Sequence, residues 1–177
     1  FISRGVMMNN LPQRKCQRLK DYDYSQNGYY FITLCTQNRM HLFGQIVGAI
    51  HESPELVHMK LCDNGIIVKS IIENLSVRFP DIHIDQYVIM PNHIHMIVVI
   101  SGERAIRESP LPKRSLVSQV IGYLKMNTTK QIHGIDNKVD VWQRGYHDHI
   151  IRNEKEYLEI SEYIETNCLK WELDKYY

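Results

Sequence analysis

Two blocks of apolar residues within 87–100 meet at a Pro-Asn pair. β-Branched and aromatic residues fill both blocks, and Pro91 with Asn92 interrupts them, so the pattern predicts two β-strands joined by a turn. Successive side chains of a strand point to opposite faces, which places His93 and His95 on the same face. Histidine is the commonest protein metal ligand, and a rigid strand can hold two for one ion. The alternation also fits an ordinary half-buried strand with a polar face, and spacing alone favours that interpretation by about two to one.

The remaining hydrophobic segments predict further strands and two long helices. Apolar residues spaced three and four positions apart predict helices at about 66–79 and 115–132. Asn64 and Gly65 are expected to precede the first helix, and Pro80 is expected to end it. Aromatic and β-branched residues predict the other extended segments, at 29–36, 41–49, 56–61 and 141–152.

A last helix is predicted to begin after Asn153, a residue type that caps helix N-termini. Glu156, three positions later, completes a pattern that resembles a capping box. Tyr163 and Asn167 are four positions apart, so we expect them one above the other at the edge of the buried side. With 11 tyrosines in the chain, the pattern by itself predicts only a boundary residue at Tyr163. The buried side is expected to consist of Tyr157, Ile160, Ile164 and Cys168.

Composition fits one globular domain over residues 1–177, with 44% hydrophobic residues and a polar, basic arm at 1–26. The formal charge of +1 does not by itself indicate a nucleic-acid partner. Two basic clusters stand out, and each taken alone is more typical of a solvated surface. They consist of Arg14, Lys15, Arg18 and Lys20, and of Arg104, Arg107, Lys113 and Arg114.

The four cysteines form no CxxC pair and no zinc-ribbon spacing, which is typical of free thiols in a reducing compartment. Residues 1–10 lack the apolar run of a signal peptide, and no later run approaches the roughly 20 apolar residues of a membrane span. These patterns predict a soluble, cytoplasmic protein without a membrane partner.

The segment Met90-Pro91-Asn92-His93-Ile94-His95 resembles the histidine-hydrophobe-histidine motif of HUH endonucleases. Within that group it is most similar to the single-tyrosine transposases of insertion sequences, and above all to the REP-associated tyrosine transposases. The His-x-His pattern alone is weak, but the ordered set of matches is specific and covers most of the chain. The other matches lie at 18–24, 30–36, 42–44, 142–153 and 163–167.

The resemblance implies an α+β fold, with a ferredoxin-like or RRM-like antiparallel sheet backed by helices and a C-terminal catalytic helix. The predicted order of strands and helices fits this outline. In the family a late helical tyrosine is the nucleophile, which corresponds to Tyr163. A polar residue four positions later supplies a third metal ligand beside the two histidines, which corresponds to Asn167. Relatives often place proline after this asparagine, whereas this chain has Cys168.

The chemistry expected from the resemblance is nicking of single-stranded DNA beside a hairpin, followed by strand transfer. His93, His95 and Asn167 would bind Mg²⁺ or Mn²⁺, which polarises the scissile phosphate and stabilises the departing 3′ oxygen. Attack by Tyr163 would give a 5′-phosphotyrosine and a free 3′-OH, and a later 3′-OH could reverse the step. Insertion-sequence relatives tend to act as dimers, whereas the REP-associated branch need not, so a homodimer and a monomer both stay open.

Several side chains are candidates for contacts with such DNA. Exposed aromatic rings can stack unpaired bases, and Tyr29, Phe31 and Trp142 are candidates, although core packing is the stronger expectation for the last two. Basic side chains would bind phosphates and give affinity rather than sequence choice. These are Arg14, Lys15, Arg18, Lys20 and Lys125, with Arg144, His147 and His149 as secondary candidates.

Two other interpretations remain open. The chain could be a noncatalytic single-stranded nucleic-acid-binding module on the same fold. It could also be an unrelated metalloenzyme that combines His93 and His95 with His147 and His149, a set that would favour zinc or iron over Mg²⁺.

Overall fold

The computed structural model describes residues 22–48, 57–102 and 114–171. Its main sheet has four antiparallel strands in the order β4 (Ile82–Ile89), β5 (His93–Ile100), β1 (Gly28–Cys35) and β6 (His147–Ile151). A separate antiparallel hairpin pairs β2 (Gly44–Val47) with β3 (His58–Leu61). The helices are η1 (Gln37–Arg39, 3-10), α1 (Asp63–Glu73), α2 (Leu75–Arg78), α3 (Leu116–His133) and α4 (Glu154–Glu165).

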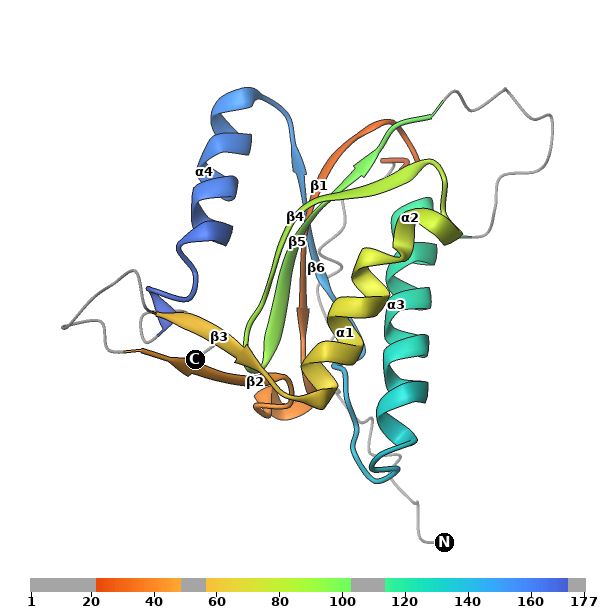
Figure 1. Ribbon diagram of the computed structural model, residues 1–177. Helices are drawn as coiled ribbons and strands as arrows, with labels where there is room; N and C mark the ends of the chain where they lie inside the picture. The colour runs from red at the N-terminus through yellow and green to blue at the C-terminus, as the bar shows by residue number, and fades with distance from the viewer. Residues whose placement is uncertain (1–21, 49–56, 103–113, 172–177) are drawn as a thin grey trace, which may run out of the picture.

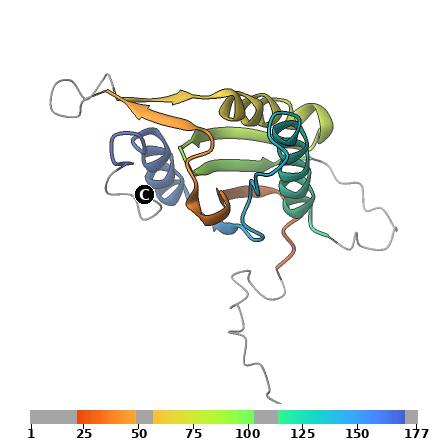
Figure 2. The ribbon, with the colours of Figure 1, turned by 90° about the horizontal axis from the view of Figure 1, so that it is seen from below.

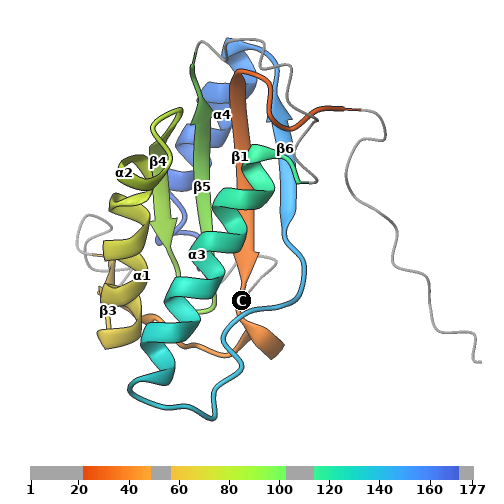
Figure 3. The same cartoon turned by 90° about the vertical axis from the view of Figure 1, so that its right-hand side faces the viewer.

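Helices cover the two faces of the sheet unequally. Figure 1 shows α1, α2 and α3 on one face and α4 alone on the other. On the first face α3 runs across β5 and β1 (Figure 3). The β2–β3 hairpin extends beyond the sheet on the side of α4 (Figure 2). This arrangement confirms the predicted fold class, an antiparallel sheet backed by helices with a further helix at the C-terminal end. Within the described segments, no helix is both long and apolar enough to cross a membrane.

Strand β5 is buried along its whole length because it lies between two partner strands and is covered on both faces. The side that carries Ile94 and Met96 packs into the main core under α1 and α3. The side that carries Ile97 and Val99 packs into a smaller cluster with Ile164 of α4. The interpretation of an ordinary half-buried strand with a polar face is therefore wrong. His93 and His95, which share the α4 side, are 0% and 1% exposed.

Several predicted elements are confirmed. The hairpin strands at 44–47 and 58–61 lie within their predicted segments, and the Pro-Asn break separates β4 from β5. The first strand is Gly28–Cys35, one residue earlier than the predicted 29–36. Helix α3 begins after Ser115, whose hydroxyl accepts a hydrogen bond from the Ser118 amide at 3.4 Å.

Several predicted boundaries are wrong. β4 begins at Ile82, before the predicted apolar block that starts at residue 87. The first helix begins at Asp63, because Asn64 and Gly65 lie inside its first turn rather than before it. The predicted strand at 141–152 is ordered as a strand only over β6, and its earlier part forms a single isolated bridge between Thr36 and Trp142. Within the predicted arm, the described residues 22–26 fold against the domain, and Tyr24 is only 5% exposed in the main core.

Gly65 is required where α1 passes close to the loop before β2. A Cβ at Gly65 would lie 2.2 Å from the backbone oxygen of Phe43. The amide of Phe43 donates to the Pro91 carbonyl at 3.1 Å, and the amide of Cys62 donates to the Phe43 carbonyl at 3.0 Å. One backbone segment thus links the start of α1 to the turn that leads into the histidine strand.

Gly65→Ala should lower the free energy of unfolding by about 1–3 kcal/mol, because the new methyl group overlaps backbone that has no room to move. The matched control is Gly122→Ala in α3, where a Cβ meets nothing within 4 Å. That control should be about 1 kcal/mol more stable than the parent, since alanine is the better helix former. Urea denaturation of the two variants tests the pair, and a stabilised Gly65→Ala protein would contradict the packing described here.

Candidate active site

The paired histidines of β5 are held by hydrogen bonds on one ring nitrogen each. Nδ1 of His93 lies 2.7 Å from Oδ1 of Asn92, and Nδ1 of His95 lies 2.8 Å from Oγ1 of Thr33. Because a carboxamide oxygen only accepts hydrogen bonds, Nδ1 of His93 donates and its Nε2 is the basic nitrogen of the neutral ring. The two ring centroids are 4.5 Å apart. Two imidazoles with fixed orientations therefore share one small volume under α4.

Tyr163 of α4 reaches this pair directly. Its hydroxyl lies 3.1 Å from Nε2 of His95, and the two ring centroids are 5.0 Å apart. Phe31 of β1 stacks on the His95 ring at 5.3 Å and meets the edge of Tyr163 at 6.2 Å. The phenol that the sequence pattern alone predicted as a boundary residue thus contacts His95 and the ring of Phe31.

A cap holds the beginning of α4. Oδ1 of Asn153 accepts from the amide of Glu156 at 2.9 Å, which confirms the predicted N-cap. The carboxylate of Glu156 reaches the amide of Arg152 at 2.7 Å, one residue before the cap, and also bonds Nε2 of His149 at 2.8 Å. The amide hydrogen bond and His149 hold the pKa of the Glu156 carboxyl below its usual 4.5.

A bulge in β4 fixes how α4 lies on the sheet. The pairing with β5 shifts between Ile84 and Gln86, which leaves Asp85 as the extra residue. Oδ2 of Asp85 accepts from the hydroxyl of Tyr157 at 2.7 Å, and Oε1 of Gln86 accepts from Ser161 at 2.8 Å. Tyr157 and Ser161 are one helical turn apart, so the two bonds set the position of α4 along β4 and, with it, the position of Tyr163.

Asn167 lies beyond the helix and not on it, so the predicted stacking of Tyr163 and Asn167 along one helix is wrong. Helix α4 ends at Glu165, and the hydroxyl of Thr166 donates back to the Glu162 carbonyl at 2.8 Å. The following turn lies against the residue that directly follows β4, because Sγ of Cys168 lies 3.9 Å from Sδ of Met90. Asn167 is 1% exposed in this turn.

Trp171 closes the same end of the site. Its ring stacks on His93 with centroids 5.9 Å apart and an interplanar angle of 21°. The turn after α4 therefore leads to a ring that covers His93, and the same turn contains the buried Asn167. Oδ1 of Asn167 and Nε2 of His93 are both buried side-chain atoms.

The donor set at this site suits a divalent metal ion. Two neutral imidazoles offer nitrogen ligands, and the carboxamide of Asn167 offers an oxygen. The hydrogen bonds from Nδ1 to Asn92 and Thr33 are of the kind that orient a ligating histidine. These residue types are therefore of the kind that can ligate a divalent metal ion.

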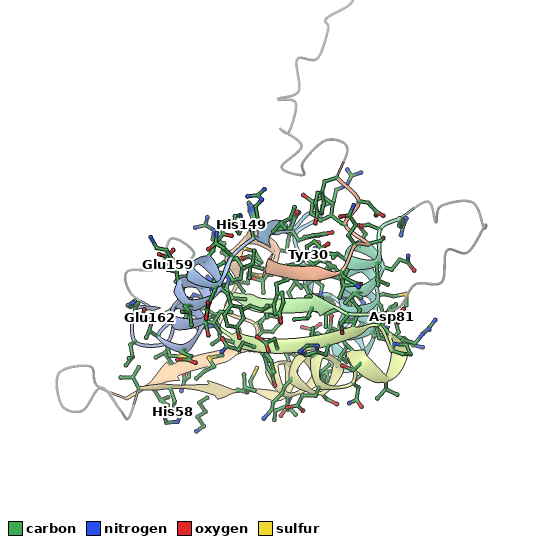
Figure 4. All side chains as sticks on the ribbon, turned by 90° about the horizontal axis from the view of Figure 1, so that it is seen from above. Tyr30, His58, Asp81, His149, Glu159 and Glu162 are labelled. Atoms are coloured by element: carbon green, nitrogen blue, oxygen red, sulfur yellow. The ribbon has the colours of Figure 1, made fainter. Side chains whose placement is uncertain are left out.

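The four-histidine alternative is not supported. His147 and His149 lie on β6, which is separated from β5 by β1. Among residues 22–48, 57–102 and 114–171, no group of three or more His, Cys, Asp or Glu side chains gathers as a metal site. His149 instead bonds Glu156 at the edge of the sheet beside the start of α4, as Figure 4 shows.

The predicted DNA-contact residues are placed unevenly. Lys125 donates to the carbonyls of Gln143 and Gly145 at 2.7 and 2.5 Å, and burial lowers its pKa to about 8. It thus has a structural role that the sequence did not indicate. Arg144 is exposed and lines, with Lys125, a cavity of about 510 Å³ beside α3. The remaining predicted contacts, Arg14, Lys15, Arg18 and Lys20, lie outside the described residues.

The three aromatic candidates for base stacking have different surroundings. Trp142 packs on Phe43, and its Nε1 donates to Thr128 at 2.8 Å, which is the expected core role. Phe31 packs inside the site against His95. Tyr29 is 42% exposed. Of the three, Tyr29 presents the most accessible ring.

Sequence reasoning missed the side chains that position the site. Asn92 was noted only as part of a turn, although its position beside His93 could have suggested a partner. Thr33 becomes a partner of His95 only through the pairing of β1 with β5, and Gln86 meets α4 only through the bulge. These contacts join residues at least 62 positions apart in the chain, and no local pattern signals them.

No family model matches the chain. A protein of Haemophilus influenzae described as uncharacterized is 40% identical over 179 residues, which cover 94% of this chain and 94% of that protein. A solved REP-associated tyrosine transposase bound to a REP hairpin gives a TM-score of 0.59 at 21% identity, over 89% of this chain and 76% of that chain. A candidate transposase of Deinococcus radiodurans gives 0.46 at 14% identity, over 84% and 97% of the respective chains.

Glu156→Gln should destabilise the protein at pH 7 and leave it unchanged in acid. The folded carboxyl has a lowered pKa, so its stabilising effect is present above 4.5 and is lost as the pH falls through the folded value. The stability difference between the parent and the variant should therefore shrink and vanish below pH 4.5. Chemical denaturation across this range measures it.

The control for this pH series is Glu162→Gln. Glu162 is exposed on the outer face of α4, away from the sheet, in Figure 4. The free energy of unfolding of the Glu162→Gln variant should equal that of the parent at every pH. A Glu156→Gln deficit that persists unchanged into acid would mean that the lost contacts do not depend on the carboxylate charge.

Proposed function

Because the chain belongs to one family with the 40% identical Haemophilus influenzae protein and has the fold of a REP-associated tyrosine transposase, we propose that it is a single-tyrosine transposase of the HUH type. In this proposal it nicks single-stranded DNA beside a hairpin and transfers strands through a covalent 5′-phosphotyrosine. The observation that carries the proposal is the hydroxyl of Tyr163 at 3.1 Å from Nε2 of His95, next to His93. A tyrosine hydroxyl, which can act as a nucleophile, thus lies beside two histidines, which can bind a metal ion.

His93, His95 and Asn167 would hold a Mg²⁺ or Mn²⁺ ion. Such an ion supplies positive charge to the scissile phosphate and to the departing 3′ oxygen. Asn92 and Thr33 orient the two rings through Nδ1. Burial under α4 and Trp171 keeps bulk water from the two histidines, which are 0% and 1% exposed, and so strengthens electrostatic interactions there.

The covalent step exchanges one phosphoester for another. The phenol oxygen of Tyr163 attacks phosphorus, the bond from phosphorus to the 3′ oxygen breaks, and the upstream fragment leaves with a free 3′-OH. The proton of the phenol has to be lost because a phenol with the usual pKa near 10 is a weak nucleophile. Apolar contact with Phe31 on one side of Tyr163 limits the directions from which phosphate can approach.

Tyr163→Phe should abolish the covalent product while leaving DNA binding intact. The test incubates the protein with 5′- and 3′-labelled single-stranded hairpin DNAs from the flanks of its own gene, with Mn²⁺ or with chelator. The parent should attach to the fragment downstream of the cut only when Mn²⁺ is present. The matched control is Tyr123→Phe, a tyrosine of α3 on the opposite face of the sheet, which should keep the adduct.

Each other outcome of this assay has a defined meaning. DNA binding without cleavage by the parent would favour the noncatalytic module on the same fold. An adduct that persists in Tyr163→Phe would assign the nucleophile to another tyrosine. An adduct on the upstream fragment would reverse the proposed polarity.

The hydroxyl of Tyr163 should leave His95 when that histidine takes up metal, because Nε2 cannot bind an ion and accept this hydrogen bond together. With ¹³C-labelled tyrosine, the Cζ resonance of Tyr163 should shift on titration with Mg²⁺. The resonance of Tyr30, whose hydroxyl donates to the Gln26 carbonyl at 2.8 Å in the main core, should stay in place. An unchanged Tyr163 signal at saturating Mg²⁺ would contradict the proposed ligand set.

A further inference from the structure

A second cavity lies on the face of the sheet that carries Tyr163, at the corner where β6 passes into α4. Its volume is about 350 Å³, which lies within the range of small-ligand sites. Rings form part of its wall, and polar side chains form its rim. The lining residues are Tyr29, Ile151, Arg152, Asn153, Glu154 and Tyr157.

Two tyrosines give this cavity its stacking surface. The ring of Tyr29 is 42% exposed and meets Tyr157 in an edge-to-face contact, with centroids 5.6 Å apart. Tyr157 is itself held by its hydrogen bond to Asp85. A half-exposed ring that is held by a tethered neighbour leaves part of its surface open for a flat ligand to stack on, at little entropic cost.

Charge around the cavity favours a base over a phosphate. Glu154 lies in the first turn of α4 and is exposed, and the carboxylates of Asp85 and Glu156 are close along the same corner. Arg152 is the one cation among the lining residues. A phosphate would meet this excess of negative charge, whereas a neutral base can donate hydrogen bonds to a carboxylate.

The cavity lies in line with the nucleophile. Tyr29 and Phe31 are two residues apart on β1, which is about 7 Å, and they point to the same face. Phe31 then contacts the ring of Tyr163 at 6.2 Å. With about 3.4 Å between stacked nucleotides, a base in the cavity belongs to a nucleotide within about four of the phosphate at Tyr163.

We propose that this cavity binds one unpaired nucleobase of the DNA, stacked on Tyr29, with Glu154 accepting a hydrogen bond from the exocyclic amino group of that base. The inference rests on the proposed function, because it takes single-stranded DNA as the ligand. It adds a specificity-determining site on the face of the sheet that also carries the nucleophile. Tyr29 would hold the base by its ring, and Glu154 would discriminate amino-bearing bases from thymine.

The experiment measures binding alone, in a Tyr163→Phe background that prevents turnover. The probes are the hairpin DNAs from the flanks of its own gene, with single abasic sites placed at each unpaired position in turn. Removal of the base at one position should weaken binding of the DNA by about 5- to 150-fold, as expected for the loss of a stacked base. Adding Tyr29→Ala should weaken binding of intact DNA by a similar factor and remove the sensitivity at that position. Tyr29→Phe should retain binding, because it keeps the ring.

Two further measurements separate stacking from a general loss of folding. The fluorescence of 2-aminopurine at the sensitive position should be quenched when the DNA binds the Tyr163→Phe protein. It should not be quenched when Tyr29→Ala is added to that protein. Glu154→Gln should reduce the preference for an amino-bearing base over thymine at that position only. The control Leu158→Ala removes a side chain that is 57% exposed on α4 and should change neither signal.

The result that overturns the inference is specific. If the hairpin DNA binds but Tyr29→Ala binds it as tightly, or weakens every abasic probe by the same factor, the cavity does not hold a base. If none of the DNAs binds and the parent forms no adduct, the proposed function fails together with the inference. Binding of intact DNA with adduct formation, but without a Tyr29-dependent position, rejects the inference alone.

Discussion

The burial of two imidazoles on a fully covered strand is the constraint on which the candidate site depends. A buried polar group destabilises a fold unless it is hydrogen-bonded. His93 and His95 meet this requirement through three different elements: Asn92 in the turn before β5, Thr33 on the neighbouring strand, and Tyr163 on α4. The same contacts fix the orientation of the two rings. The hydrogen bonds that stabilise the buried histidines therefore also hold them in place to bind a ligand.

Helix α4 is attached differently from the other helices. α1 and α3 pack into the main core, whereas α4 covers a small cluster built around Ile97, Val99, Ile151 and Ile164. Polar contacts therefore carry much of its positioning, at Asn153 by the cap and at Asp85 and Gln86 by the bulge. These contacts set the position of Tyr163 along the sheet. Apolar packing alone is not directional and would define that position less precisely.

The functional proposal and the proposed base site use the same face of the sheet. Aromatic rings of β1 run along it from Tyr29 to Phe31, and the second ring touches both His95 and Tyr163. The outer face of α4, by contrast, presents Glu159 and Glu162 to solvent (Figure 4), which disfavours a DNA backbone there. A strand of DNA that reaches the nucleophile is therefore expected along β1 and β6, where unpaired bases can stack on aromatic rings and the DNA avoids Glu159 and Glu162 on the outer face of α4.

The sequence by itself determined the elements whose signals are local. The Pro-Asn break, the periodicity of α3 and the cap at Asn153 each act over a few residues, and each is where the pattern predicted. Because a strand alternates its side chains, the sharing of one face by His93 and His95 was also set by the sequence. Resemblance to a known family, not periodicity, singled out Tyr163 among 11 tyrosines.

Only the tertiary structure decided how these pieces meet. β5 is buried on both faces because α1 and α3 cover one face and α4 covers the other, and strand alternation carries no information about a second covering layer. Thr33 and Gln86 become partners through strand pairing and a bulge, and Lys125 is held by carbonyls about 20 residues away. The early end of α4, which places Asn167 in a buried turn, depends on the Thr166 hydroxyl and on contact with Met90 and His93. Each of these depends on contacts between distant segments, which hydrophobic spacing does not encode.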